Sequence, residues 1–326
     1  MSNVSSVLTS IIALILIIII ALMGDFEVIF KLLANNYTVV FVLIITSVSI
    51  FYARVFRNYF LLKQNEFLDA SFRKFLLQGT IAGTVSVYGP LKSGELLAIK
   101  IYDDYFSTEK SDALSMVVVS RIFDVVIVIL LASSAIFFIP RSLLGDLFFV
   151  LGFIISVLIC IIFALLYKPI GLSILAWLLR HTPKSMKEKV GKLNHFFVRY
   201  YDTYPLILKN KQTRILFVLT SLFRWCVDLF ASWFLLYSFE IRLNFLMILP
   251  IVGFSYAIGV ASGTPGALGT AQLTSLSILL LYGIDETLAA TALIFGTAIN
   301  TLVILALGLG AILINFVFSS STTEPI

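Results

Sequence analysis

The chain alternates long apolar runs with short polar stretches, which is the pattern of a protein whose helices cross a membrane. A helix needs about 20 apolar residues to cross the hydrocarbon core. Six segments fit this pattern and are predicted to be full spans: 7–23, 37–52, 112–138, 148–167, 214–237 and 286–318. The predicted fold is therefore an all-α, polytopic membrane protein.

Two further apolar regions, 75–105 and 245–282, are interrupted by glycine and proline. Each half of these regions is too short to cross comfortably, so each region is predicted to form a re-entrant, broken-helix hairpin. Broken backbone is tolerated in hydrocarbon only where it is buried in protein or lines a wet cavity, so such breaks indicate a transport site. The residues assigned to the breaks are Gly89, Pro90 and Gly94, and Thr264, Pro265, Gly266 and Gly269.

The two hairpin regions also share their spacing to the long span that follows. Leu114 follows Pro90 by 24 residues, and Leu288 follows Pro265 by 23 residues. Basic residues flank the first region and acidic residues flank the second, so the two are expected to enter from opposite faces. The sequence therefore predicts an inverted repeat.

The composition supports a membrane protein without a sizeable soluble domain. Of the 326 residues, 60% are hydrophobic and 13% are charged, and the mean hydropathy is +1.05. Soluble domains carry about 25% charged residues. One transmembrane domain covering residues 1–326 is predicted, and the net charge of +5 favours anionic lipid headgroups over nucleic acid as partners.

Basic residues set the expected orientation. The segment 168–213 is rich in lysine and arginine with interleaved aromatic residues, as expected for a cytoplasmic loop of amphipathic helices at the interface. It could be a solvated loop that sets topology or a specific headgroup site. Arg54 and Arg57 follow the predicted second span and are placed on the same face. Both termini are then cytoplasmic in a multi-pass protein of the cell (plasma) membrane.

No metal, cofactor or catalytic motif is expected from the residues. Cys160 and Cys226 both lie in apolar runs, with no histidine or second cysteine at ligand spacing. The acidic pair Asp103 and Asp104 lies at a helix end and is expected to be interfacial. The sequence thus predicts a protein that is not an enzyme.

Ionisable residues occur inside apolar sequence, where each needs a partner or a wet cavity. Three pairs share a helix face or a hairpin tip by their spacing: Lys92 with Glu95, Arg121 with Asp124, and Arg224 with Asp228. Each pair could simply neutralise itself. Alternatively, Lys92, Arg121 and Arg224 could surround one cavity and bind a phosphate, with the carboxylates keeping the empty site near neutral. Half-helices that begin after the two prolines would further favour an anion.

These motifs together resemble a known family. The residues that carry the resemblance are Pro90-x-x-x-Gly94-Glu95, Arg121-x-x-Asp124 and Thr264-Pro265-Gly266-x-x-Gly269. They resemble the lysylphosphatidylglycerol synthase transmembrane-region family, also called the flippase-like family, over most of the chain. The resemblance implies a polytopic lipid translocase, without the soluble aminoacyl-transferase domain that some members carry.

The chain departs from the family pattern at four places. Ala267 replaces a glycine, Gln272 replaces an acid, and Ser120 replaces a frequent glutamate before Arg121. An arginine that is frequent early in the last span is replaced by the Phe295-Gly296-Thr297 stretch. Gln272 remains a candidate substrate-binding residue, but the lost charges put the substrate and the activity in question.

The leading hypothesis is a lipid flippase that moves a lipid with an anionic or lipid-linked headgroup through a polar intramembrane cavity. The expected partners are anionic phospholipid or polyprenyl-phosphate-linked sugar. The alternatives are a membrane-embedded transferase acting on a lipid-linked substrate and a non-transporting accessory subunit. No nucleotide-binding motif is present, so transport would be passive or coupled to an ion or the membrane potential.

Overall fold

The computed structural model describes residues 36–63, 71–88, 93–106, 110–138, 209–262 and 264–321, with a few short pieces elsewhere. Every regular element in these ranges is a helix, and they contain no strand. The predicted spans 7–23 and 148–167 lie almost wholly outside the described residues, as do most of the basic segment 168–213 and the first hairpin tip with Gly89 and Pro90.

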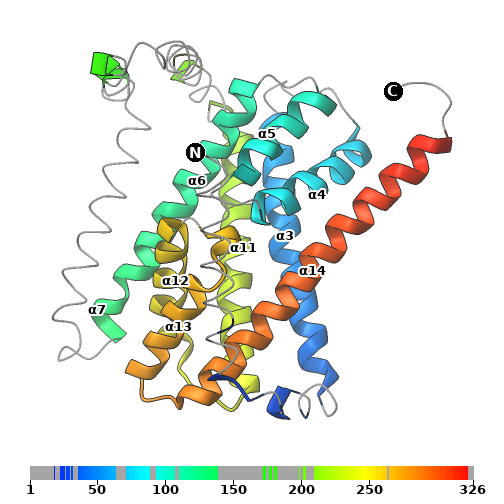
Figure 1. The fold of residues 1–326 in the computed structure, drawn as a ribbon. Coiled ribbons are helices and arrows are strands. Elements are labelled where there is room, and N and C mark those ends of the chain that lie inside the picture. Colours follow the sequence, from blue (N-terminus) through cyan, green and yellow to red (C-terminus); the bar gives the residue numbers. More distant parts are fainter. Residues whose placement is uncertain are drawn as a thin grey trace.

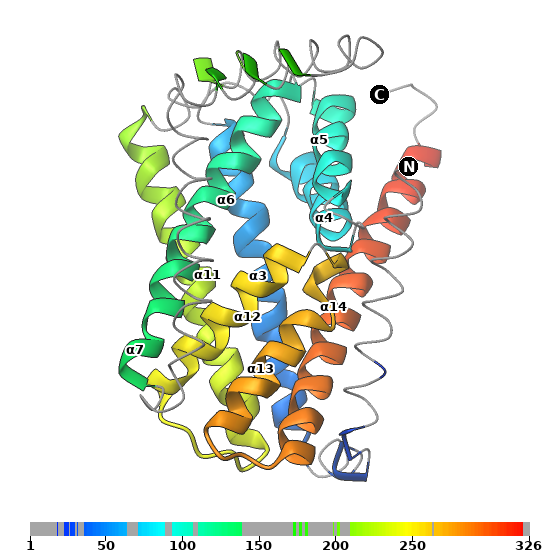
Figure 2. The same ribbon diagram turned by 60° about the vertical axis from the view of Figure 1, so that its left-hand side comes forward.

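The described helices form one bundle (Figures 1 and 2). They are α3 (Tyr37–Lys63), α4 (Phe72–Tyr88), α5 (Ser93–Phe106), α6 (Lys110–Ser133), α7 (Ala135–Phe138), α11 (Lys211–Ser238), the short 3-10 turn η3 (Phe245–Met247), α12 (Ile248–Ser262), the 3-10 turn η4 (Pro265–Ala267), α13 (Thr270–Leu281) and α14 (Glu286–Ser321).

Five of these helical segments are long and apolar enough to cross a membrane: Tyr37–Lys63, Asp112–Ser133, Lys211–Ser238, Phe245–Ser262 and Glu286–Val317. Their outer faces are apolar, since large side chains such as Leu309 and Phe316 on α14 are exposed. An exposed apolar helix face is stable in hydrocarbon rather than in water. The chain is therefore a multi-pass membrane protein.

Two helical hairpins occupy opposite halves of the bundle (Figure 2). The pair α4 and α5 lies in the upper half and the pair α12 and α13 in the lower half, and α4 ends near the middle of the bundle, where α12 and α13 are connected (Figure 2). A Cβ atom built on Gly266 in the second turn would lie 3.5 Å from Cδ1 of Tyr88, the last residue of α4. The end of α4 therefore lies against the turn of the second hairpin.

Helix contacts follow a two-fold pattern between the units α3–α6 and α11–α14. Helix α4 packs against α14 of the other unit, and α12, its counterpart, packs against α6, the counterpart of α14. The first helices of the units, α3 and α11, pack against each other. The first hairpin helix of each unit thus packs against the long final helix of the other unit.

Aromatic rings hold the first hairpin to α3. The ring of Phe75 on α4 stacks on Tyr102 of α5 with centroids 6.0 Å apart, and it contacts Tyr59 of α3 at 5.0 Å. Phe75 is fully buried and Tyr102 nearly so. This packing fixes the position of α5, whose first turn carries Glu95.

The two ends of the bundle differ in charge (Figure 1). The end at which α4 and α11 begin carries Lys63, Arg73, Lys74, Lys211 and Arg214 together with Asp103, Asp104 and Asp112. The opposite end carries Asp25, Glu27, Glu240, Asp285 and Glu286 together with Lys31 and Arg242. This asymmetry accords with the charge pattern from which the orientation is predicted.

The predicted end of the second span at residue 52 is wrong. Helix α3 continues to Lys63, so Arg54 and Arg57 lie inside the bundle and not in a cytoplasmic flank. Arg57 is buried, because a carboxylate on α6 neutralises it there. The helix therefore need not end at the first charged residue.

A glycine makes the contact between α12 and α6 possible. A Cβ atom on Gly253 would overlap the backbone nitrogen of Ala132. We expect Gly253→Ala to lower the thermal unfolding midpoint in detergent, because one of the two backbones must move. Gly310→Ala on α14 is the matched control, since no atom lies within 4 Å of its Cβ position. The control should be neutral or stabilising by up to about 1 kcal/mol, from helix propensity alone. Equal effects of both changes would contradict this account.

Candidate functional site

Asp124 on α6 is the centre of a buried group of charges. Both of its carboxylate oxygens accept hydrogen bonds from Arg57 of α3, at 2.9 Å from Nη1 and 3.2 Å from Nη2. Nη1 of Arg224 on α11 donates to Oδ1 of Asp124 at 2.8 Å, and the indole nitrogen of Trp225 donates to the same oxygen at 3.3 Å. One carboxylate therefore ties three membrane-spanning helices together.

These partners are not the ones that the sequence predicts. Arg224 was expected to pair with Asp228 four residues later, but its ion pair is with Asp124. Asp228 instead accepts a 2.6 Å hydrogen bond from the hydroxyl of Tyr256 on α12. Contacts between helices outweigh contacts along one helix here, because a buried arginine needs a carboxylate in line with its guanidinium plane.

Arg121 behaves differently from the two buried arginines. It makes its close ion pair, 2.5 Å long, with Glu95 in the first turn of α5, while its distance to Asp124 is 3.9 Å. Its side chain is 38% exposed, against 3% for Arg57 and 2% for Arg224. The pair formed by Arg121 and Glu95 is thus accessible and links the first hairpin to α6.

A small cavity lies beside these charges. Its volume is about 30 Å³, and α3, α4, α5 and α6 all line it, with Arg54, Glu95, Ser120 and Arg121 among the lining side chains. In this state it has room for about one water molecule. We call the surrounding ionisable residues the charge cluster: Arg54, Arg57, Glu95, Arg121, Asp124, Arg224 and Asp228.

Two predicted site residues lie apart from the cluster or outside the described chain. Lys92 belongs to the part of the first hairpin tip that is not described. Gln272 caps α13, where its side-chain oxygen accepts a 2.7 Å hydrogen bond from the amide of Gly269. Its amide nitrogen donates to the hydroxyl of Thr297 on α14 at 2.9 Å. Gln272 therefore connects the second hairpin to the last span and does not join the charge cluster.

The second break is built from left-handed backbone and hydroxyl groups. Gly266 and Gly269 have φ values of 60° and 82°, as glycine permits, and Ala267 takes 57° despite its Cβ atom. The hydroxyls of Ser262, Thr264 and Thr270 lie 2.9 to 3.1 Å from one another and share hydrogen bonds. Gly94, in contrast, lies within α5, and its φ is not positive.

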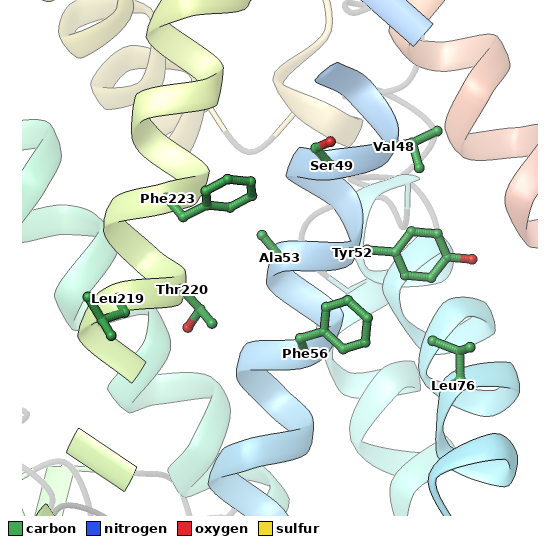
Figure 3. Close-up of a pocket in the computed structure, with 9 residues that line it drawn as sticks. All are labelled: Val48, Ser49, Tyr52, Ala53, Phe56, Leu76, Leu219, Thr220 and Phe223. Carbon is green, nitrogen blue, oxygen red and sulfur yellow. The ribbon is translucent and has the colours of Figure 1, made fainter. Parts of the chain in front are cut away.

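An apolar groove of about 630 Å³ lies on the other side of α3 (Figure 3). It runs between α3, α4 and α11 and contains no charged side chain. Figure 3 shows Phe56 and Tyr52 of α3 and Phe223 of α11 around it, with only hydroxyl groups as polar atoms. The groove suits hydrocarbon and not a charged headgroup.

The sequence analysis missed Arg54 and Arg57 as site residues. Their signal is the spacing of two arginines three residues apart on one helix face, after a span that is apolar as far as Tyr52. Among the described residues, no group of three or more His, Cys, Asp and Glu side chains could hold a metal ion.

Comparison with known proteins identifies the class to which this bundle belongs. Residues 6–308 match the family described as the lysylphosphatidylglycerol synthase transmembrane region. The chain belongs to this family, and this confirms the resemblance carried by its motifs. The family indicates a membrane protein related to lipid handling. No curated protein and no solved structure matches the chain.

Asp124→Asn tests the structural role of the central carboxylate. It would leave Arg57 and Arg224 buried without a counter-charge, so we expect a loss of about 3–5 kcal/mol in stability, measured by denaturant unfolding in detergent. Glu95→Gln is the matched change at the accessible pair and should cost about 1 kcal/mol or less. Similar losses for the two variants would show that Asp124 is not the tie between the spans.

Ala267→Gly tests the backbone of the second break. The left-handed conformation costs a non-glycine residue about 1–2 kcal/mol, so the change should raise the thermal unfolding midpoint. Ala298→Gly, at an exposed position inside α14, should lower the midpoint instead, by about 1 kcal/mol in stability. The same sign for both variants would count against the strain at Ala267.

Proposed function

We propose that the protein is a lipid flippase which moves a lipid with an anionic headgroup between leaflets through the space around the charge cluster. The observation that carries this proposal is the accessible ion pair of Arg121 and Glu95, at a cavity lined by the first hairpin. A charged pair inside the membrane is costly and marks a pathway or a binding site by default.

The bound headgroup would compete with Glu95 for Arg121. Arginine can hold a phosphate by two parallel N–H···O bonds, and the carboxylate restores neutrality when the headgroup leaves. The hydrocarbon chains would stay in the bilayer, where the groove between α3, α4 and α11 offers an apolar surface. Because the cavity holds only about one water molecule, admitting a phosphate requires α4 and α5 to move away from α3 and α6.

We further propose that both hairpins are re-entrant and belong to an inverted repeat, with the basic end of the bundle in the cytoplasm. The contact of Tyr88 with Gly266 and the reciprocal packing of α4 on α14 and of α12 on α6 support this arrangement. Rocking of one unit against the other would then open the cavity to each leaflet in turn. The sequence contains no nucleotide-binding motif. Net transport would therefore follow the lipid gradient or be coupled to an ion.

Leaflet exchange in proteoliposomes tests the proposal. Fluorescent phosphatidylglycerol, phosphatidylcholine and a polyprenyl-phosphate sugar are reconstituted with the wild type and with Arg121→Ala. We expect exchange that depends on the headgroup in the wild type and at least about a tenfold loss in the variant, since a hydrogen bond to a charged group contributes about 1.5–3 kcal/mol. Arg121→Ala should still enter the membrane, because Asp124 keeps Arg57 and Arg224.

Arg214→Ala is the matched control, since Arg214 is exposed near the start of α11 and away from the cavity. It should leave exchange unchanged. Exchange that is unaffected by Arg121→Ala would reject this site. If folded wild-type protein exchanges no lipid, the membrane-embedded transferase and the accessory subunit replace the flippase.

A further inference from the structure

Two polar atoms at the cavity have no hydrogen-bond partner in the described part of the chain. They are Nε of Arg54 and Oγ of Ser120, and both are buried. Both side chains line the same small cavity. The buried Nε atoms of Arg57 and Arg224 are also unpartnered, but the outer nitrogens of those two guanidinium groups already bind Asp124. A buried polar atom without a partner calls for a water or a ligand.

The hydroxyl of Ser120 is unusual for these helices. Hydroxyl groups inside a helix commonly donate to the carbonyl one turn earlier, as Thr80, Thr220 and Ser255 do here. Ser120 is 4% exposed, yet its hydroxyl makes no such bond. Its donor is therefore free to serve another group inside the cavity.

The charge cluster carries one positive charge in excess, because four arginines face three carboxylates. Asp124 binds Arg57 and Arg224, and Glu95 binds Arg121. Among the described residues, Arg54 forms no ion pair, and its buried Nε atom has no hydrogen-bond partner, while the third carboxylate, Asp228, is bound by the hydroxyl of Tyr256. The cluster as a whole thus lacks one negative charge, and Arg54 is the arginine beside the cavity that has no ion pair.

We propose that Arg54 and Ser120 form the phosphate position of this site and select a lipid phosphate of single negative charge. The inference rests on the proposed function and names the residues that give it its headgroup preference. Arg54 supplies the uncompensated charge, and the Ser120 hydroxyl donates to a phosphate oxygen. A zwitterionic headgroup gains less here, because its own cation adds to the existing excess.

The residue at position 120 decides whether this positive excess remains. A glutamate there would bring the cluster to four carboxylates against four arginines and balance its charge. In this chain the side chain is a serine, and the positive excess remains. Ser120→Glu should therefore remove the preference for anionic lipid, while Ser120→Gln adds nearly the same volume without the charge.

Lipid binding in detergent provides a test that does not depend on transport. Thermal shifts and native mass spectrometry are recorded with phosphatidylglycerol, phosphatidylcholine, diacylglycerol and inorganic phosphate. We expect the wild type to bind phosphatidylglycerol at least about tenfold more tightly than phosphatidylcholine, the scale of one hydrogen bond to a charged group. Arg54→Gln and Ser120→Glu should abolish this preference, and Ser120→Gln should retain most of it.

The unliganded variants report on folding. Arg54→Gln removes a cation that has no ion pair among the described residues, so its melting temperature without lipid should not fall. An unchanged phosphatidylglycerol preference in Arg54→Gln would overturn the inference, and so would a shift caused by inorganic phosphate but not by lipid. If binding follows the prediction but wild-type proteoliposomes show no exchange, the flippase proposal fails and the phosphate position stands. If exchange occurs but both variants keep the preference, the phosphate position fails alone.

Discussion

The fold depends on Asp124, one carboxylate that satisfies two buried arginines from two other spans. Charges in a low-dielectric interior lose their hydration, and only close, well-aligned partners offset that cost. Arg57 from α3, Arg224 from α11 and Asp124 from α6 meet this condition together. Because no two of the three helices are adjacent in the chain, this contact fixes the arrangement of both structural units. The cavity beside it exists only in this arrangement.

Exposure separates the charges that hold the bundle from those that can meet a ligand. Asp124 and its two arginines are almost fully buried. A headgroup could therefore reach them only if the packed helices around them separated. Arg121 and Glu95 are partly exposed and can exchange partners without such a loss. The accessible pair lies next to the buried group, and surroundings of low polarity strengthen the electrostatic attraction in both.

Much of the architecture can be read from the sequence, but the partners of its charges cannot. Gly-Pro breaks, spacing and flanking charge predict two hairpins that enter from opposite faces, and the pairs α4–α5 and α12–α13 lie in opposite halves of the bundle (Figure 2). Spacing along a helix shows which residues share a face of that helix. It does not show which other helix packs against that face. The sequence therefore pairs Arg224 with Asp228 on its own helix, whereas in the structure its ion pair is with Asp124 on α6. The same limit hides Arg57, whose burial depends on a carboxylate 67 residues later.

The two hairpins are equivalent in fold but different in chemistry, and this difference bears on the lost family charges. The first hairpin adds Glu95 to a charged cavity, while the second meets the last span through neutral groups. Gln272 and Thr297 stand at or next to the places where the family pattern has an acid and an arginine, and they hydrogen-bond to each other. In this chain the second hairpin thus meets the last span at this point through one neutral hydrogen bond, with no unpaired charge. An accessory role therefore does not follow from the lost family charges, because the charged half of the structure is intact and holds the only cluster of buried arginines among the described residues.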